Sequence, residues 1–256
     1  MNNTNRAAFG KNFLRLSSAC LVAALVLLCS AGPAPAAGPT LSIGEILSKT
    51  EANYRNIHAF TAIFSQKTVS AAATNLGAQK AGGKLYYAKP RQMRWQYDKP
   101  QKQIFVANNK FAWLSSSNEK QINLFEAQKL FASPLASTFF DGALRLRDHF
   151  HVTLDPVLST PQTAVLQLTP LHQDPNIKLA YLWIDLRTYL ISRVETQDLL
   201  GNTNEITITS FTPRTSLDPA LFRLQVPPGA KVLDANGRIL TNAGIEQLQS
   251  EISSGK

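Results

Sequence analysis

Residues 89–97 read Lys89-Pro90-Arg91-Gln92-Met93-Arg94-Trp95-Gln96-Tyr97, and this stretch decides the fold. From Met93 onward, large apolar side chains alternate with polar ones, which is the period of a β-strand with one apolar face. The same period of two begins at Phe60, where Phe60, Ala62 and Phe64 alternate with their neighbours. Both stretches predict strands whose aromatic side chains share one face of a sheet.

Similar short segments follow along most of the chain, separated by turn residues such as Asn108-Asn109. About eleven or twelve strands with few helices predict a mainly β (α+β) fold with one large, curved antiparallel sheet in meandering order. The strands after Phe60 are expected at 79–87, 93–97, 103–107, 111–115, 121–125, 152–155, 163–169, 177–185, 189–197, 204–211 and 222–226.

Two helices are expected. Ser42-Ile43-Gly44-Glu45 is a capping box, and apolar residues at helical spacing continue it to a predicted end near residues 56–58. Ser133-Pro134-Leu135 is typical of a second helix start, with Leu135 and Phe139 four residues apart and Gly142 as the expected stop. This central helix is either a buried core helix or a mobile lid over a cavity, and the residues alone leave both open.

The first residues resemble an export signal. Three basic residues precede the apolar stretch 16–29, and Ala34-Pro35-Ala36-Ala37 has the small residues of a cleavage site. We expect a cleaved signal peptide at 1–36 and an exported protein; a retained N-terminal anchor is the alternative. Both cysteines fall inside this segment, and the bulky residues before Cys29 argue against lipid attachment there.

The remaining chain is expected to be one domain, 37–234, followed by a polar, loosely attached tail, 235–256. Removing three basic residues leaves 23 basic and 17 acidic ones, a net charge of +6, without a dense basic run. No nucleic-acid recognition motif is present, so an anionic lipid surface or an acidic partner protein is favoured over nucleic acid.

Signals for catalysis or metal binding are weak. Ser117-Asn118-Glu119-Lys120 has the Ser-x-x-Lys spacing but is expected in a polar turn, where the two side chains cannot share a helix face. His149 and His151 would supply only half of a zinc site. We expect no catalytic residues, no metal and no cofactor.

The aromatic residues are more informative. Trp95, Tyr97, Trp113, Tyr181 and Trp183 lie on expected strands. They fill either an ordinary sandwich core or the inner surface of a curved sheet that encloses a ligand, and both interpretations stay open at this point.

An ordered set of motifs resembles the outer-membrane lipoprotein carrier family, the LolA-type periplasmic chaperones. The resemblance covers about residues 41–234. The motifs are Lys89–Tyr97, Phe60-Thr61-Ala62-Ile63-Phe64-Ser65-Gln66-Lys67, Phe111-Ala112-Trp113-Leu114, Ser133-Pro134-Leu135-Ala136, Leu182-Trp183-Ile184-Asp185, Asp198-Leu199-Leu200-Gly201-Asn202-Thr203 and Leu224-Gln225-Val226-Pro227-Pro228-Gly229.

The resemblance implies an unclosed barrel in which the two helices act as a lid over an apolar cavity that holds the acyl chains of lipoproteins. An inner-membrane ABC transporter would load this carrier, an outer-membrane receptor would unload it, and the carrier itself would be a monomer without enzymatic activity. Its expected cavity residues here are Phe64, Leu85, Met93, Trp95, Tyr97, Trp113, Leu135, Phe139 and Trp183.

The family's lid latch is typically an arginine before the proline, where this chain has Lys89. Lysine keeps the charge but lacks the planar fork of donors. Arg91 is expected to share the face of Lys89, so either residue is a candidate latch. The alternatives to a lipoprotein carrier are the outer-membrane receptor, a carrier of another lipid or glycolipid, and a periplasmic hydrolase.

Overall fold

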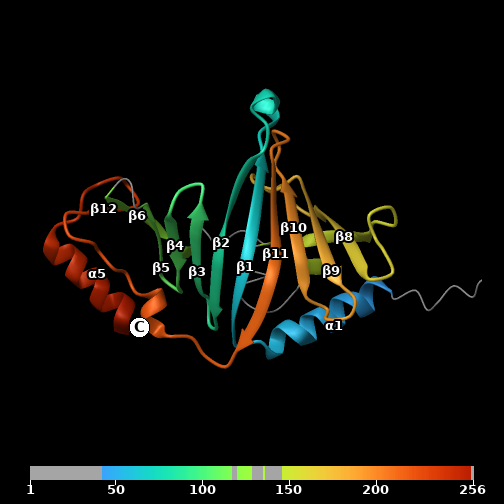
Figure 1. Cartoon of the computed structure of the whole chain (residues 1–256), viewed down its shortest axis with the longest axis horizontal. Helices are drawn as coiled ribbons and strands as arrows, with labels where there is room; N and C mark the ends of the chain where they lie inside the picture. The colour runs from blue at the N-terminus through green and yellow to red at the C-terminus, as the bar shows by residue number, and fades with distance from the viewer. Residues whose placement is uncertain (1–41, 117–119, 129–134, 136–145, 255–256) are drawn as a thin grey trace, which may run out of the picture. The chain divides into compact units, whose positions relative to one another are not determined.

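The computed structural model describes residues 42–116, 120–128, 135 and 146–254, which belong to one compact unit (Figure 1). The expected signal peptide lies outside the described residues, as does the central helix apart from Leu135. Within the described ranges, no helix is both long and apolar enough to cross a membrane.

Helix α1 (Ile43–Asn56) begins at the predicted capping box. The Ser42 hydroxyl accepts a hydrogen bond from the Glu45 amide (3.2 Å), and the Glu45 carboxylate accepts one from the Ser42 amide (2.9 Å). Two orphan amides of the first turn are thereby satisfied. The helix ends at Asn56, so both predicted ends are confirmed.

Twelve strands form one sheet in the order β12-β6-β5-β4-β3-β2-β1-β11-β10-β9-β8-β7. Two consecutive meanders, β1 to β6 and β7 to β11, are joined by antiparallel pairing of β1 with β11. In the described residues the outermost strands, β12 and β7, do not pair with each other, so the sheet is not closed into a barrel. The prediction of a mainly β fold with one large unclosed sheet is confirmed.

The strands are β1 (Ala59–Val69), β2 (Gln79–Ala88), β3 (Gln92–Lys99), β4 (Gln103–Ala107), β5 (Phe111–Ser116), β6 (Gln121–Glu126), β7 (Phe150–Leu154), β8 (Thr163–Pro170), β9 (Leu179–Asp185), β10 (Ile191–Gln197), β11 (Thr203–Arg214) and β12 (Lys231–Leu233). The other helices whose bounds lie within the described residues are η1 (Ala71–Leu76), α4 (Leu146–His149), η2 (Pro219–Phe222) and α5 (Asn242–Ser254).

The prediction of a last strand at 222–226 is wrong. Phe222 and Leu224 are buried, but this segment forms the end of η2 and an unpaired stretch. Alternation shows which side chains are buried and does not show whether the backbone finds a strand partner. The edge strand beside β6 is instead β12, which pairs with β6 in parallel.

The expectation of a loosely attached tail is also wrong. Residues 242–254 form α5, whose side chains Ile245, Leu248 and Ile252 pack in one cluster with Trp113 of the sheet. These apolar residues recur at helical spacing, so the helix has an apolar stripe that the sheet covers.

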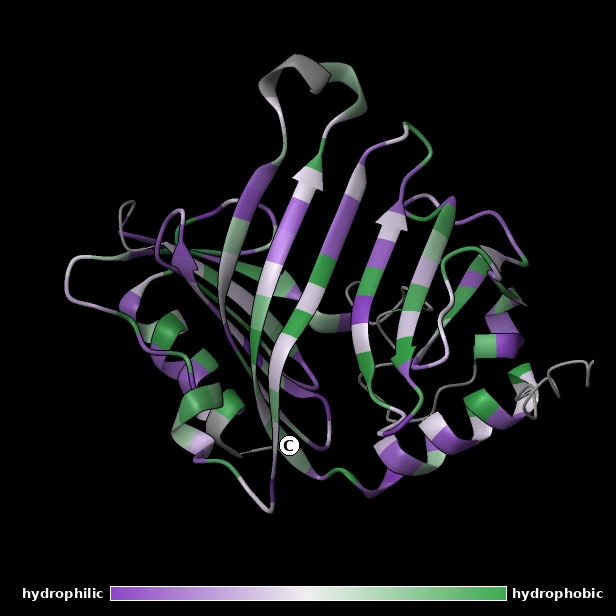
Figure 2. Ribbon diagram, turned by 45° about the vertical axis from the view of Figure 1, so that its right-hand side comes forward, coloured by the Kyte–Doolittle hydropathy of each residue, from purple (hydrophilic) through white to green (hydrophobic). Residues whose placement is uncertain are grey.

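The sheet has two chemically different faces, assigned from the pairing register because opposed residues share a face. We call the face against α1 the inner face and the face under α5 the outer face. Leu182, Val194 and Ile206 are successive cross-strand partners on the inner face. The alternation of green and purple along the strands in Figure 2 follows this arrangement.

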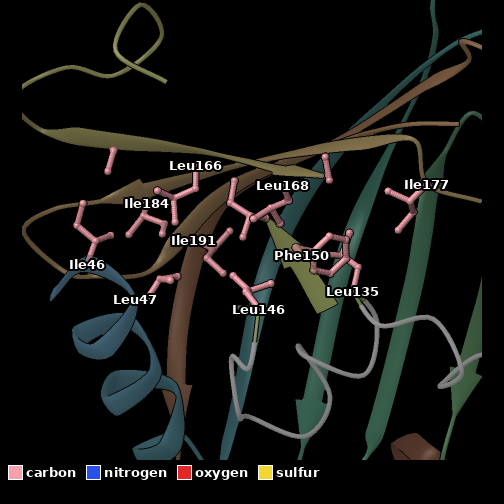
Figure 3. Packing of buried hydrophobic residues seen from close by; sticks show 13 residues of the cluster. Ile46, Leu47, Leu135, Leu146, Phe150, Leu166, Leu168, Ile177, Ile184 and Ile191 are labelled. Carbon is pink, nitrogen blue, oxygen red and sulfur yellow. The ribbon is translucent and has the colours of Figure 1, made fainter. Parts of the chain in front are cut away.

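The inner face carries two apolar clusters. The first, beneath α1, contains Ile46 and Leu47 of the helix together with Leu166, Ile184 and other sheet residues (Figure 3). The second lies on β1 to β5 and β11 and includes Phe64, Leu85 and Met93. The outer-face cluster is separate and is covered by α5 and the segment around Phe222.

Candidate functional site

A row of aromatic rings lies on the inner face where β1, β2 and β3 are neighbours. Phe64 of β1 is 2% exposed, and its ring centroid lies 4.6 Å from that of Trp95 and 5.1 Å from that of Tyr97, both edge-on. Gly83 stands between Phe64 and Tyr97 in the register, so no side chain separates the two rings across the three strands. We call Phe64, Trp95 and Tyr97 the aromatic row.

A second aromatic group continues the inner face toward the start of β1. The Phe60 ring stacks on Tyr87 at 5.1 Å and lies 4.7 Å from Phe211 of β11. Met93 is buried opposite Tyr87 of this group, and Leu85 is buried opposite Trp95 of the aromatic row.

The two inner-face clusters differ in how well they are covered. Beneath α1, Leu166, Leu182 and Ile184 are fully buried. In the other cluster, Trp95, Tyr97 and several further rings are only partly buried. Large apolar side chains therefore keep accessible surface on the inner face beside a well-covered core.

Five of the nine expected cavity residues come together in this cluster, namely Phe64, Leu85, Met93, Trp95 and Tyr97. Leu135 is buried, but it lies in the cluster beneath α1 (Figure 3). Phe139 lies outside the described residues.

Trp113 and Trp183 are placed on the outer face, contrary to expectation. Trp113 pairs with Val106 and packs under α5, and Trp183 pairs with Arg193, whose guanidinium lies 4.0 Å from its ring. In both strands the neighbouring positions point inward, because one step along a strand changes the face.

Three contacts hold α1 to the turn between β9 and β10. The Tyr54 hydroxyl accepts a hydrogen bond from the Ile191 amide (3.1 Å), and the Asn53 side chain donates to the Thr188 carbonyl (2.6 Å). The Lys49 ammonium donates to the Tyr189 hydroxyl. Burial raises the pKa of Tyr54 to about 12.

Lys89 makes a fourth contact, from the turn between β2 and β3. Its ammonium donates to the main-chain carbonyls of Tyr54 (3.1 Å) and Arg55 (2.9 Å) at the carboxyl end of α1. A cation is favoured there, because the last carbonyls of a helix lack helical partners and carry partial negative charge. Partial burial lowers the pKa of Lys89.

Arg91 does not follow the expected alternation. Residues 89–91 form the turn itself, so the rule that places alternate strand residues on one face does not apply to them. Arg91 has a positive φ of 50° and makes interactions of its own.

Sequence reasoning missed a polar cluster at the far end of the inner face. Gln66, Thr68, Tyr97 and Asn204 are linked by hydrogen bonds there. A signal was present, because Gln66 continues the period of two that starts with Phe60, Ala62 and Phe64.

In the described parts of the chain, no three His, Cys, Asp or Glu residues are grouped so that they could hold a metal ion. His149 ends α4 and His151 lies in β7, so the two do not share a strand. Of the Ser-x-x-Lys spacing, only Lys120 is described, and it lies in a turn.

These features define a single-sheet α+β protein with a partly exposed aromatic face and a helix held beside it, an architecture suited to apolar molecules. The chain belongs to the family described as outer membrane lipoprotein carrier protein LolA, whose model matches residues 55–225. Proteins of this family are carriers or chaperones and not enzymes.

Among its relatives, the outer-membrane lipoprotein carrier protein of Coxiella burnetii is 27% identical over 202 residues, which is 76% of this chain and 86% of the relative. The carrier of the same name from Azotobacter vinelandii is 24% identical over 75% of this chain and 94% of its own length. A solved LolA superfamily protein from Nitrosomonas europaea is 12% identical, with a TM-score of 0.40 over 72% of this chain and 99% of its own.

Proposed function

We propose that this chain carries acylated lipoproteins through the periplasm and shields their acyl chains on the inner face. The observation that carries this proposal is the set of partly buried aromatic rings there, beside the buried core beneath α1. Family membership supports lipoproteins as cargo, since the relatives are named as lipoprotein carriers.

The physical need for such a surface is large. Exposing an acyl chain to water costs about 0.8 kcal/mol per methylene, or on the order of 10 kcal/mol per chain. Aromatic rings cover this much apolar surface with little loss of side-chain entropy, because few torsions are fixed on binding. The cavity residues proposed to contact the chains are Phe64, Leu85, Met93, Trp95 and Tyr97. Phe139 is proposed as a further contact from the family resemblance alone.

Helix α1 is proposed as the lid and Lys89 as its latch. The Lys89 ammonium binds two main-chain carbonyls in the last turn of the helix, of which the Tyr54 carbonyl also accepts a hydrogen bond from the Ile57 amide. Release of Lys89 frees only the carboxyl end of α1, whereas lifting the whole helix would also expose Ile46 and Leu47.

The remaining steps are proposed from the family. Residues 1–36 are removed on export, residues 37–234 form the carrier domain, and α5 extends this domain on the outer face. A monomer accepts cargo from an inner-membrane ABC transporter and delivers it to an outer-membrane receptor.

The test is a gentle pull-down of the tagged protein from periplasm, followed by intact mass spectrometry of what co-purifies. We expect acylated lipoproteins with the wild type and a strong loss with Trp95→Glu, which places a charge in the aromatic row. Trp183→Glu is the matched control, because Trp183 lies on the outer face.

Retention of lipoproteins by Trp95→Glu, with loss in Trp183→Glu, would contradict the inner-face site. Recovery of free lipid or glycolipid instead of lipoproteins would keep the apolar site and overturn the choice of cargo.

A further inference from the structure

The polar cluster on the inner face consists of Gln66 and Thr68 of β1, Tyr97 of β3 and Asn204 of β11. Thr68 is the register partner of Asn204, and Gln66 that of Ile206, so three strands contribute to one site. β1 begins beside Ala88 and the latch turn, and the cluster lies at its opposite end. All four side chains are partly buried.

Hydrogen bonds within the cluster use its acceptors. The Tyr97 hydroxyl donates to Gln66 Oε1 (3.0 Å), and Gln66 Nε2 donates to Asn204 Oδ1 (2.7 Å). The Thr68 hydroxyl donates to the same Asn204 oxygen (3.2 Å). Both amide oxygens are therefore engaged.

The donors are in excess. Each primary amide carries two N–H donors. Among the described residues, Asn204 Nδ2 donates to no group, and Gln66 Nε2 uses one of its two hydrogens. Polar groups that become covered need partners, so a molecule that covers this cluster must bring hydrogen-bond acceptors.

The cluster also selects for neutral acceptors. Lys67 and Glu205 are the nearest charged residues along β1 and β11, and alternation places both on the outer face, where Glu205 pairs with Arg193 at 2.6 Å. Amide and hydroxyl groups without a cation suit a carbonyl better than a phosphate, which favours charge-assisted partners.

Tyr97 belongs to both the cluster and the aromatic row. A hydrocarbon chain lying along Phe64 and Trp95 ends beside Gln66 and Asn204. Of the two ends of an acyl chain, only the ester or amide end supplies such an acceptor, a carbonyl oxygen without a donor hydrogen.

We propose that Gln66 and Asn204 bind the acyl carbonyls of the cargo, with Tyr97 and Thr68 orienting the two amides. This inference rests on the proposed function, because it requires acyl chains on the inner face. Its consequence is a direction of binding: the linked head of the cargo lies at the end of the sheet away from Lys89, and the methyl ends point toward the latch.

The experiment compares two uncharged lipids with equal chains, a dioctanoyl glycerol ester and the dioctyl glycerol ether, which lacks the carbonyls. Binding is followed by titration calorimetry on the full-length mature protein. We expect the wild type to bind the ester about tenfold more tightly, the effect of one or two hydrogen bonds. Asn204→Leu should reduce this preference to about twofold or less while leaving ether binding within about threefold.

Asn123→Leu is the matched control. Asn123 also lies on the inner face, but on β6, away from the cluster, and this variant should keep the ester preference. Asn204→Asp provides a second variant if Asn204→Leu does not fold, since it is nearly isosteric and replaces the donor with an acceptor; it too should lose the preference.

The outcomes separate the two claims. Equal binding of ester and ether by the wild type, or an unchanged preference in both Asn204 variants, overturns the carbonyl site and leaves the acyl carrier intact. Failure of the wild type to bind either lipid overturns the proposed function itself.

Discussion

At position 89 the ammonium group of a lysine meets the carbonyl end of α1. A hydrogen bond from a charged donor contributes about 1.5–3 kcal/mol, and partial exposure of the group favours the lower figure. Lys89→Leu should therefore raise the rate of amide hydrogen exchange in α1 about tenfold, measured residue by residue over 43–57.

The comparison variants sharpen this prediction. Lys89→Arg keeps the charge and several donors and should exchange like the wild type, whereas Lys84→Leu removes an exposed lysine of β2 and should have no effect on α1. Arg91→Leu tests the other candidate of the sequence. An unchanged exchange rate of the α1 amides in Lys89→Leu would contradict the proposal that Lys89 is the latch.

The ionisation of Tyr54, which lies in α1, is expected to make the free energy of unfolding depend on pH. Its pKa is raised to about 12 in the fold from 10.0, so the folded state keeps the proton while the unfolded chain loses it. The stability from this group is complete below pH 10 and is lost as the pH rises toward 12, by about 1.4 kcal/mol per unit. Denaturant unfolding at pH 9 and pH 11 should show this loss in the wild type.

Tyr54→Phe should remove that slope. It should also lower stability at neutral pH by about 1–3 kcal/mol, because the Ile191 amide loses its acceptor. An identical difference between pH 9 and pH 11 in wild type and variant would show that Tyr54 does not ionise on unfolding as argued.

The residue scale is where sequence reasoning is least secure. Alternation correctly grouped Met93, Trp95 and Tyr97, because they lie on a single strand. Alternation could not show whether Trp113 and Trp183 lie on the same face as these residues. It relates side chains within one strand, whereas the face shared between strands depends on their pairing register. The four-way cluster of Gln66 and Asn204 needs the β1–β11 pairing, which joins residues 138 positions apart.

Among the elements, the β2–β3 pair depends on a glycine. A Cβ on Gly83 would lie 1.9 Å from the Gln96 carbonyl oxygen. This oxygen belongs to the paired backbone of β3, so it cannot move away without disturbing the strand pairing. Gly83→Ala should lower the free energy of unfolding by more than about 2 kcal/mol, through the strain of an overpacked site. Denaturant titration measures it.

Gly44→Ala is the control for this substitution. At Gly44 in α1 the nearest atoms to an added Cβ lie 3.8 Å away, which is ordinary contact. Alanine there should be neutral or stabilising by up to about 1 kcal/mol. Equal effects at both glycines would contradict the assigned β2–β3 register.

Helix α5 is expected to contribute to the stability of the fold, because it packs against the sheet. Leu248 is 8% exposed and shares a cluster with Trp113, which is 3% exposed. Leu248→Ala should cost about 2–3 kcal/mol in thermal or denaturant unfolding, and Glu246→Ala on the exposed side of the same helix less than about 0.5 kcal/mol. A neutral Leu248→Ala would show that α5 detaches readily.

The elements themselves were largely predictable. The capping box placed α1, and period two placed β1 to β11 to within a few residues, because these signals are local. The helix α5 also has a local signal in Ile245, Leu248 and Ile252, but the polar residues around it obscured the stripe. β12 is only three residues long, so its sequence has no recognisable period. It is identified as a strand only by its pairing with β6.

At the scale of the whole molecule, the number of strands predicts one large sheet but not its order. Local patterns do not reveal that the first strand stands in the middle, between β2 and β11, because that pairing joins distant parts of the chain. The family resemblance supplied the unclosed arrangement, and the structure then distinguishes an inner face with partly buried rings from an outer face on which α5 covers a separate cluster.

Acyl chains are proposed to lie against the aromatic row, and tryptophan fluorescence reports directly on such contact. The chain has three tryptophans, of which Trp95 lies on the inner face and Trp113 and Trp183 on the outer face. In the double variant Trp113→Phe and Trp183→Phe, Trp95 is the sole emitter. Titration with a diacyl lipid brominated along its chains, a quencher that acts at contact, should extinguish its emission with saturation.

The variant Trp95→Phe, which keeps the outer-face tryptophans, should be quenched little by the same lipid. These two results are expected if the acyl chains lie on the inner face. Saturable quenching of Trp95→Phe together with undiminished emission from the Trp95-only protein would place the lipid on the outer face and contradict it.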